Sequence, residues 1–285
     1  MEFRCLVTLI FCLIFCAHHN QEEPNHQVIQ NSRAFRDCPE CPLMLPEEGS
    51  TYLMGSPVDE SGRDIDECQH QETVSTFSIG VYEVTVEEYL QFADATNSCY
   101  PGWLKEGDPY NVETGSDPYY KEMGYTRNAK TLPICGVHRD YAVEYCKWLS
   151  NKTGKKYRLP LEKEWEYAAR GGKNTRHYKF AGSNNLGAVG WYNANAGGKP
   201  HLIGEKAPNE LGLYDMSGNL QEWCQDSWGP YPGCSSDKGV GGSLGVIRGG
   251  AFLIFDTHCR SADRVMVGTG VQRHAIGFRC VRDER

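Results

Sequence analysis

The sequence lacks the features that define several large classes of protein. It has no basic stripe, and its formal net charge at pH 7 is −8. Because phosphate binding needs clustered Lys and Arg, we expect no nucleic-acid partner. No internal repeat is visible, which argues against a solenoid. The 285 residues are 23% charged and 40% hydrophobic, which is typical of a globular protein, and the length fits one large domain.

A hydrophobic run long enough to cross a bilayer is also lacking at the N-terminus, where the apolar segment is only Cys5–Cys16. It follows Arg4, so we predict an export signal at residues 1–17, with a buried strand as the alternative. Leu13–Cys16 resembles a bacterial lipobox, which would place a lipid anchor on Cys16, although bulky Phe15 stands where that motif has a small residue. Residues 18–37 are polar and predict a tether. The expected location is periplasmic, outer-membrane-anchored or extracellular.

Cysteine usage agrees with export. Of 13 cysteines, three lie in the predicted signal, which leaves an even number of ten for disulfides. Cys38 and Cys41 form a C-x-x-C motif that could be redox-active, half of a zinc site or structural. No second C-x-x-C completes a zinc set, so a structural role is preferred.

The periodic segments predict an α+β domain with sparse secondary structure. One helix begins at Thr85 and ends near Asn97, because Thr85 and Glu88 form a capping box. Other helices are expected at Arg139–Asn151 and Leu161–Arg170, where glycines follow their ends. Strands are expected at Tyr52–Met54, Phe77–Val84, Val246–Arg248 and Phe278–Val281. Residues 103–131 are interpreted as a long ordered loop.

Five aperiodic blocks occur in a fixed order. Two lie near the end of the sequence: Gly212–Trp223 (GLYDMSGNLQEW), and a longer block that contains Arg248–Gly250, Arg260–Arg264 and Gly277–Cys280. The earlier blocks are Leu43–Ser56, Tyr82–Thr85, and Tyr157–Pro160 followed by Glu164–Arg170. Together they resemble the formylglycine-generating enzyme family, also called sulfatase-modifying factors, over about residues 38–281. The resemblance implies a domain at 38–285 with an elaborated C-type-lectin-like fold, and a disulfide between Cys146 and Cys280.

The enzymes of this family oxidise a cysteine of a sulfatase peptide to formylglycine with oxygen and copper. Copper(I) is soft and is bound well by paired thiolates, which follow a Gly-Gly-Ser-Tyr sequence in these enzymes. Here Ala251 replaces the serine, Ile254 stands at the first cysteine position, and Cys259 matches the second by one count only. We therefore expect a member that lacks the catalytic cysteine pair and binds no copper. Cys259 and the adjacent His258 remain weak catalytic or metal-binding candidates.

The family also holds a structural calcium ion around the block at Gly212–Trp223. The resemblance implies Asp215 and Glu222 as side-chain ligands, and Gly218 and Leu220 as carbonyl ligands. Calcium takes six to eight oxygen ligands, which carboxylates on a turn can help to supply. The alternative is that Asp215 caps a turn and Glu222 pairs with an arginine.

Between the family-like positions of the last block lie mixed, partly apolar residues with no strand or helix period. They resemble the variable segment of lectin-fold proteins that are diversified by retroelements, where a fixed frame displays ligand-binding residues. The candidate ligand-binding residues are Phe252, Leu253, Ile254, Phe255, Asp256, Thr257, His258, Asp263, Val265 and Val267. The alternative is that the apolar ones form core.

Three functions follow from these patterns. The first is an exported module that binds a ligand or a protein partner without turnover. The second is an oxidoreductase of the family with altered chemistry, acting on a protein or a small molecule. The third is a structural or regulatory protein of the cell envelope. The sequence assigns no enzyme class.

Overall fold

The computed structural model of the chain describes residues 32–234 and 243–284. The predicted export signal at 1–17, the lipid anchor at Cys16 and most of the predicted tether lie outside the described residues. Within the described residues, no helix is long and apolar enough to cross a membrane.

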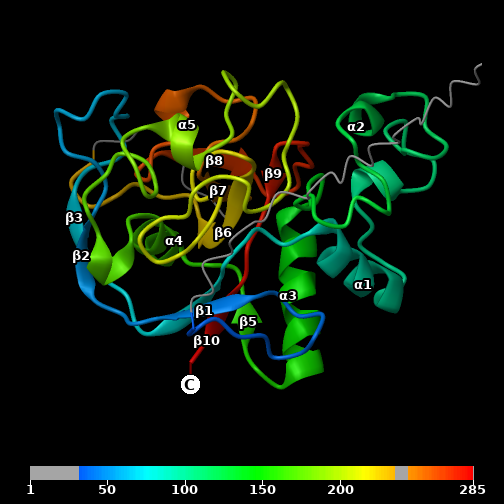
Figure 1. Ribbon diagram of the computed structural model, residues 1–285, viewed down its shortest axis with the longest axis horizontal. Coiled ribbons are helices and arrows are strands. Elements are labelled where there is room, and N and C mark those ends of the chain that lie inside the picture. Colours follow the sequence, from blue (N-terminus) through cyan, green and yellow to red (C-terminus); the bar gives the residue numbers. More distant parts are fainter. Residues whose placement is uncertain (1–31, 235–242, 285) are drawn as a thin grey trace, which may run out of the picture. The chain divides into compact units, whose positions relative to one another are not determined.

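The first sheet joins strands from distant parts of the sequence. Its order is β1 (Met44–Glu47), β4 (Phe77–Gly80), β10 (Val281–Asp283) and β5 (Tyr157–Arg158), with antiparallel neighbours. Ile79 of β4 lies between Leu45 and Val281, and all three are fully buried. The β10 strand lies between β4 and β5 and therefore holds this sheet together (Figure 1).

The second sheet carries the two aperiodic blocks near the end of the sequence. Its order is β8 (Arg264–Gly268), β7 (Leu244–Arg248), β6 (Gln221–Ser227) and β9 (Ile276–Gly277), and only the β6–β9 pair is parallel. A separate hairpin consists of β2 (Thr51–Met54) and β3 (His70–Thr73).

The three predicted helices are present within two residues of their expected ends. Helix α1 (Val86–Thr96) has the capping box of Thr85 and Glu88, and Asn97 ends it in the left-handed conformation. Helix α3 spans Arg139–Thr153, and α4 spans Glu162–Ala169. The region 103–131 is mostly loop, as expected, but contains the short helix α2 (Tyr119–Glu122). A further short helix, α5, spans Leu186–Val189.

Helices α1 and α3 pack on an aromatic core. Tyr89 of α1 and Tyr145 of α3 stack with ring centroids 5.7 Å apart, and both rings contact Phe278 edge-on. The prediction of a strand through Phe278–Val281 is therefore wrong in its bounds. Phe278, Arg279 and Cys280 lie between the two strands rather than within one, and all three side chains are buried.

Two disulfides are formed within the described residues. Cys38 is bonded to Cys41 within the C-x-x-C motif, and Cys68 is bonded to Cys234. The buried thiols of Cys146 and Cys280, the pair implied by the resemblance, lie 3.7 Å apart as free cysteines. They are neighbours at this separation without being bonded.

Residues just before Cys38 contact the domain, which places part of the predicted tether within the fold. Phe35 forms an isolated β-bridge with Met44, and Asp37 accepts a hydrogen bond of 2.6 Å from the Tyr157 hydroxyl. Arg282 also pairs with Asp37 at 2.9 Å.

Candidate functional site

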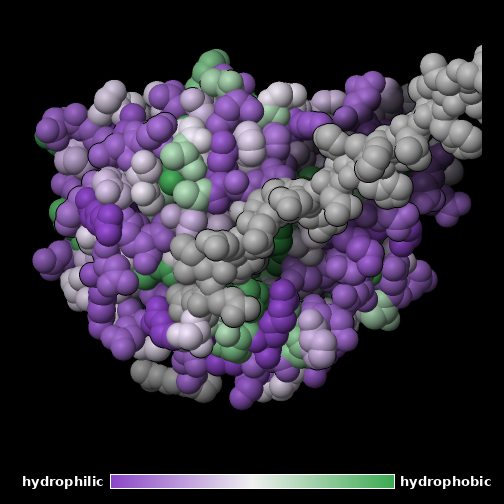
Figure 2. Space-filling model, viewed as in Figure 1, coloured by the Kyte–Doolittle hydropathy of each residue, from purple (hydrophilic) through white to green (hydrophobic). Residues whose placement is uncertain are grey.

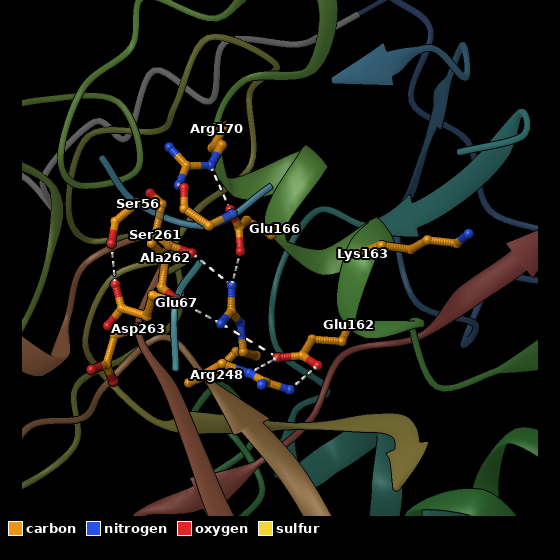
Figure 3. A network of polar contacts seen from close by, with 12 residues as sticks. Ser56, Glu67, Glu162, Lys163, Glu166, Arg170, Arg248, Ser261, Ala262 and Asp263 are labelled. Atoms are coloured by element: carbon orange, nitrogen blue, oxygen red, sulfur yellow. Dashed lines mark hydrogen bonds and ion pairs between the residues drawn. The ribbon is translucent and has the colours of Figure 1, made fainter. Parts of the chain in front are cut away.

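Three arginines of the last sequence block extend into the protein and each meets a buried glutamate. Figure 3 shows one of them, Arg248, beside Glu166 and Glu162. The three are Arg248 at the end of β7, Arg260 in the following loop and Arg264 at the start of β8, and each is at most 4% exposed. Buried guanidinium groups need a charged partner and hydrogen-bond acceptors, since an unpaired charge in the interior is very costly. These three pairs anchor the chain on both sides of the loop at residues 251–259, and we call them the arginine base.

Arg248 joins helix α4 to the backbone of the last block. Its Nη2 atom contacts Glu166 Oε2 and also donates to Ser261 O at 2.9 Å, while Nη1 donates to Ala262 O at 2.9 Å. Burial favours a raised pKa for Glu166, but Arg170 and Arg248 outweigh it and hold that pKa below its usual value. Glu166 is therefore an anchor in its ionised form.

Arg264 makes a similar contact with the first turn of α4. Its Nε and Nη2 atoms each donate to Glu162 at 2.8 Å. The guanidinium carbon lies 3.7 Å from the ring centroid of Tyr231 and 4.1 Å from that of Trp228. The Arg264 guanidinium is therefore occupied by Glu162 and by the two aromatic rings, and we assign it a structural role rather than a ligand-binding one.

Arg260 joins the last block to an acidic loop at residues 57–66. Its Nη1 and Nη2 atoms donate to Glu67 at 2.7 and 2.6 Å, and Nη1 also donates to Glu60 at 2.8 Å. The same loop touches the 251–259 loop elsewhere, because a Cβ atom on Gly62 would lie 3.0 Å from the Thr257 side chain. The two loops therefore lie side by side over the arginine base.

The candidate ligand-binding residues divide into exposed and buried groups. Leu253 is 40% exposed, Phe255 is 67% exposed and Asp256 is also exposed, whereas Ile254, Thr257, His258 and Val265 are half-buried. Phe252, Asp263 and Val267 are buried, so these three candidates do not lie on an exposed surface. Phe252 is fully buried in the main core, Val267 is 6% exposed on β8, and Asp263 is 1% exposed beside Arg260.

Four exposed large hydrophobic side chains lie on these two loops. Val58 and Ile65 are 89% and 71% exposed on the acidic loop. With Leu253 and Phe255 they make four of the seven large exposed hydrophobic residues among those the structure describes. The described residues on the face shown in Figure 2 are mainly hydrophilic, with hydrophobic residues in small groups. We call Val58, Ile65, Leu253 and Phe255 the two-loop surface.

Cys259 does not have the properties of a reactive thiol. It is fully buried and packs in a small cluster with Phe180, Leu186 and Val189. Burial, with a contribution from Asp263, raises the pKa of its thiol to about 12. A thiol that stays protonated at neutral pH is a poor nucleophile and a poor copper ligand. Ile254 offers no sulfur, so the described residues contain no paired thiolates at this position.

His258 lies apart from Cys259 and close to two carboxylates. Its Nδ1 atom lies 3.1 Å from Asp263 Oδ1, and this hydrogen bond raises the pKa of the imidazole. Ligand atoms of Asp64, His258 and Asp263 all lie within 4.8 Å of one another, the one such group found among residues 32–234 and 243–284. This group does not include Cys259, so His258 and Cys259 do not form a metal site together.

The predicted calcium ligands show a mixed fit. Glu222 is buried, and Arg279 donates to both of its oxygens at 2.6 and 2.7 Å while Trp165 Nε1 donates to Oε2 at 2.7 Å. Asp215 accepts a bond from Gly204 N through Oδ2, but its buried Oδ1 has no hydrogen-bond partner in the described structure. Glu222 is therefore already occupied by an arginine, whereas Asp215 has an oxygen to offer.

A third carboxylate lies near these two. Glu83 is 1% exposed and accepts hydrogen bonds from Asn219 Nδ2 at 2.7 Å and Leu220 N at 2.9 Å. Burial, then the charges of Asp215 and Glu222, raises the pKa of Glu83, and burial raises that of Asp215 to about 6. Three buried carboxylates near one guanidinium leave a negative excess that a cation would offset. Calcium at Asp215, Gly218, Leu220 and Glu222 stays a prediction.

Sequence reasoning identified the arginines of this site but missed their partners. Glu67 and Glu162, and Asp64 near His258, were not selected, because each comes from a segment about 100 to 200 residues away, as in Arg260–Glu67 with a separation of 193. One available signal was the acid-rich stretch at residues 59–67, DESGRDIDE, in which no apolar period explains the carboxylates.

Comparisons with known proteins agree with this architecture. The profile of the family described as "Sulfatase-modifying factor enzyme 1-like domain" matches residues 31–284. The "Chaperone protein LppX" of Paenibacillus barcinonensis is 31% identical over 189 residues, covering 56% of this chain and 65% of that protein. A formylglycine-generating enzyme of Streptomyces coelicolor is 33% identical over 171 residues, covering 53% and 52%.

The solved structure of PvdO from Pseudomonas aeruginosa is similar over nearly its whole length. It superposes with a TM-score of 0.72 at 29% identity and covers 88% of this chain and 97% of that one. This confirms the predicted α+β fold, an elaborated C-type-lectin-like fold. The chain spans 37–65% of the length of the first curated relatives that it matches.

Proposed function

The chain belongs to the family of sulfatase-modifying factor enzyme 1-like domains, and we propose that within it the chain is an exported module that binds a protein partner. The observation that carries this proposal is the two-loop surface. Its apolar side chains stand exposed on loops that buried Arg–Glu pairs hold in place. Exposed apolar clusters on a rigid base are typical of contact surfaces, because the binding site is formed before the partner arrives.

Two further observations support this reading. Cys259 is buried and Ile254 stands at the other cysteine position, which argues against the paired-thiolate copper chemistry of the enzymes. The name of one relative, a chaperone, describes a protein that binds other proteins. Export is supported by the two disulfides, Cys38–Cys41 and Cys68–Cys234, since disulfides persist mainly in oxidising compartments.

Site-specific photocrosslinking in the producing cells tests the binding function. A photoreactive amino acid at position 255 should give a discrete crosslinked adduct, whereas the same group at Leu202, which is 44% exposed elsewhere, should not. Adding Leu253→Asp should remove the adduct, because a charge at the centre of an apolar contact is costly to bury. Equal adducts from both positions, or none from position 255, would contradict the proposal.

A second experiment separates the binder from the family's own chemistry. The reduced protein, titrated with copper(I) against a competing chelator, should show no tight dithiolate site. It should also leave a sulfatase-type cysteine peptide unmodified in the presence of oxygen. Conversion of the peptide would show that the chain is an enzyme after all.

An oxidoreductase with altered chemistry is the second candidate. The family match favours it, because relatives in this family include proteins named formylglycine-generating enzyme. Oxygen consumption that depends on an added thiol or phenol substrate would support this candidate, and its absence would leave the binding module.

A further inference from the structure

A histidine and two aspartates meet where the acidic loop touches the last sequence block. Asp64 comes from the loop at 57–66, His258 from the short helical turn Asp256–His258, and Asp263 from the residue before β8. Their ligand atoms lie within 4.8 Å of one another although the segments are almost 200 residues apart. We propose that Asp64, His258 and Asp263 bind a divalent transition-metal ion of the zinc(II) type.

The distances fit such an ion. His258 Nδ1 and Asp263 Oδ1 are 3.1 Å apart. Two donors that each bind zinc at about 2.0–2.2 Å are separated by roughly 3 Å when they are adjacent in its coordination shell. The ion would therefore enter between these two atoms with little movement, and Asp64 would approach from the opposite loop.

The carboxylate of Asp263 gives independent support for a bound cation. Its side chain is 1% exposed, and its Oδ2 atom has no hydrogen-bond partner within the described part of the chain. A buried carboxylate oxygen without a donor is costly, and native structures satisfy nearly all such atoms. A metal ion bound to this carboxylate would remove that cost.

The local charge points to a cation as well. Arg260 alone contacts three carboxylates, those of Glu60, Glu67 and Asp263. Asp64 adds a fourth negative charge, whereas the acidic loop contributes only Arg63 as a second cation. A divalent ion would bring this group close to neutrality.

The donor set selects the class of ion. An imidazole nitrogen with carboxylate oxygens suits zinc and its first-row neighbours, whereas calcium and magnesium prefer oxygen alone. Three protein ligands leave at least one position for water or for a donor group of another molecule. The site lies between the loops that carry the two-loop surface, so the ion would also fix these loops against each other.

Isothermal titration of the metal-stripped, disulfide-intact protein with zinc tests the site. All samples should contain 1 mM calcium, so that an all-oxygen site is filled beforehand. The wild type should bind one zinc ion, and both His258→Gln and Asp64→Asn should weaken this binding at least about tenfold. Cobalt(II) should give a visible ligand-field spectrum with the wild type that His258→Gln abolishes.

Matched controls make the outcome decisive. His177 is an exposed histidine outside this cluster, and His177→Gln should leave zinc binding unchanged. Leu253→Asp should also leave it unchanged, which separates this site from the proposed partner contact. Circular dichroism of each variant checks folding; the two key substitutions are at accessible side chains. A wild type without zinc binding, or equal binding by His258→Gln and the wild type, would overturn the proposal.

Discussion

The pair of Glu67 and Arg260 gives the sharpest test of the buried arginine base. Both side chains are fully buried, and two hydrogen bonds of 2.6 and 2.7 Å join them. The Ser56 hydroxyl donates a third bond to Glu67, at 2.6 Å. In Glu67→Gln, the guanidinium loses its bidentate charged partner and keeps Glu60 at 2.8 Å and Asp263 at 3.5 Å. Removing one member of a buried ion pair costs about 3–5 kcal/mol, and the two remaining carboxylates should bring the cost here toward the lower end of that range.

This loss should be measured by thermal unfolding of oxidised protein. For a domain of this size, each kcal/mol shifts Tm by about 2–4 °C, so Glu67→Gln should lower Tm by roughly 6–20 °C. The matched control is Glu87→Gln, which breaks the pair of Glu87 and Lys130 at 2.9 Å on the surface, where both side chains are about half exposed or more. That substitution should leave Tm unchanged within error, since exposed pairs contribute little.

A double variant distinguishes charge from shape. Glu67→Leu combined with Arg260→Met removes both charges and keeps apolar volume, so it should be more stable than Glu67→Gln. If Glu67→Gln instead melts like Glu87→Gln, the buried pair does not hold the acidic loop. The description of the two loops as a fixed surface would then be wrong.

Three other predictions concern separate parts of the fold. Burial raises the pKa of Glu47 to about 7, so the folded protein retains a proton that the unfolded chain releases above about pH 4.5. The free energy of unfolding, measured with urea, should therefore fall as pH rises between these values, and Glu47→Gln should flatten that profile. A calcium chelator should lower Tm, and Asp215→Asn should abolish the effect; identical melts with and without chelator would remove the calcium site. Mass spectrometry of protein oxidised in the periplasm should find Cys146 linked to Cys280, which closes a loop of 134 residues and should stabilise by about 5 kcal/mol; two alkylated thiols would refute the bond.

The helices could be predicted from local sequence because their ends carry local signals. The capping box at Thr85 and the glycine after Thr153 act within one turn of the chain. Strand β6 was missed for the opposite reason. Its first four residues, Gln221–Cys224, are all buried, so no alternation of polar and apolar residues marks it.

The candidate site was predictable in outline and not in its pairings. The glycines and arginines of the last block indicated a folded-back backbone, and the structure places those arginines in the interior. Which of the intervening residues face solvent depended on packing. Phe252 and Phe255 have the same side chain three residues apart, yet one is fully buried and the other is 67% exposed. Asp64 was not identified because its proximity to His258 is a tertiary contact.

The position of β10 in the first sheet constrains how the protein is made. Val281 pairs with Ile79, a partner 202 positions earlier, so a chain still emerging from the ribosome lacks the strand that joins β4 to β5. Synthesis therefore cannot complete this domain in stages from its beginning. Contacts between such distant residues form slowly, because a long loop must close first. The first sheet can therefore close only after β10 has been synthesised.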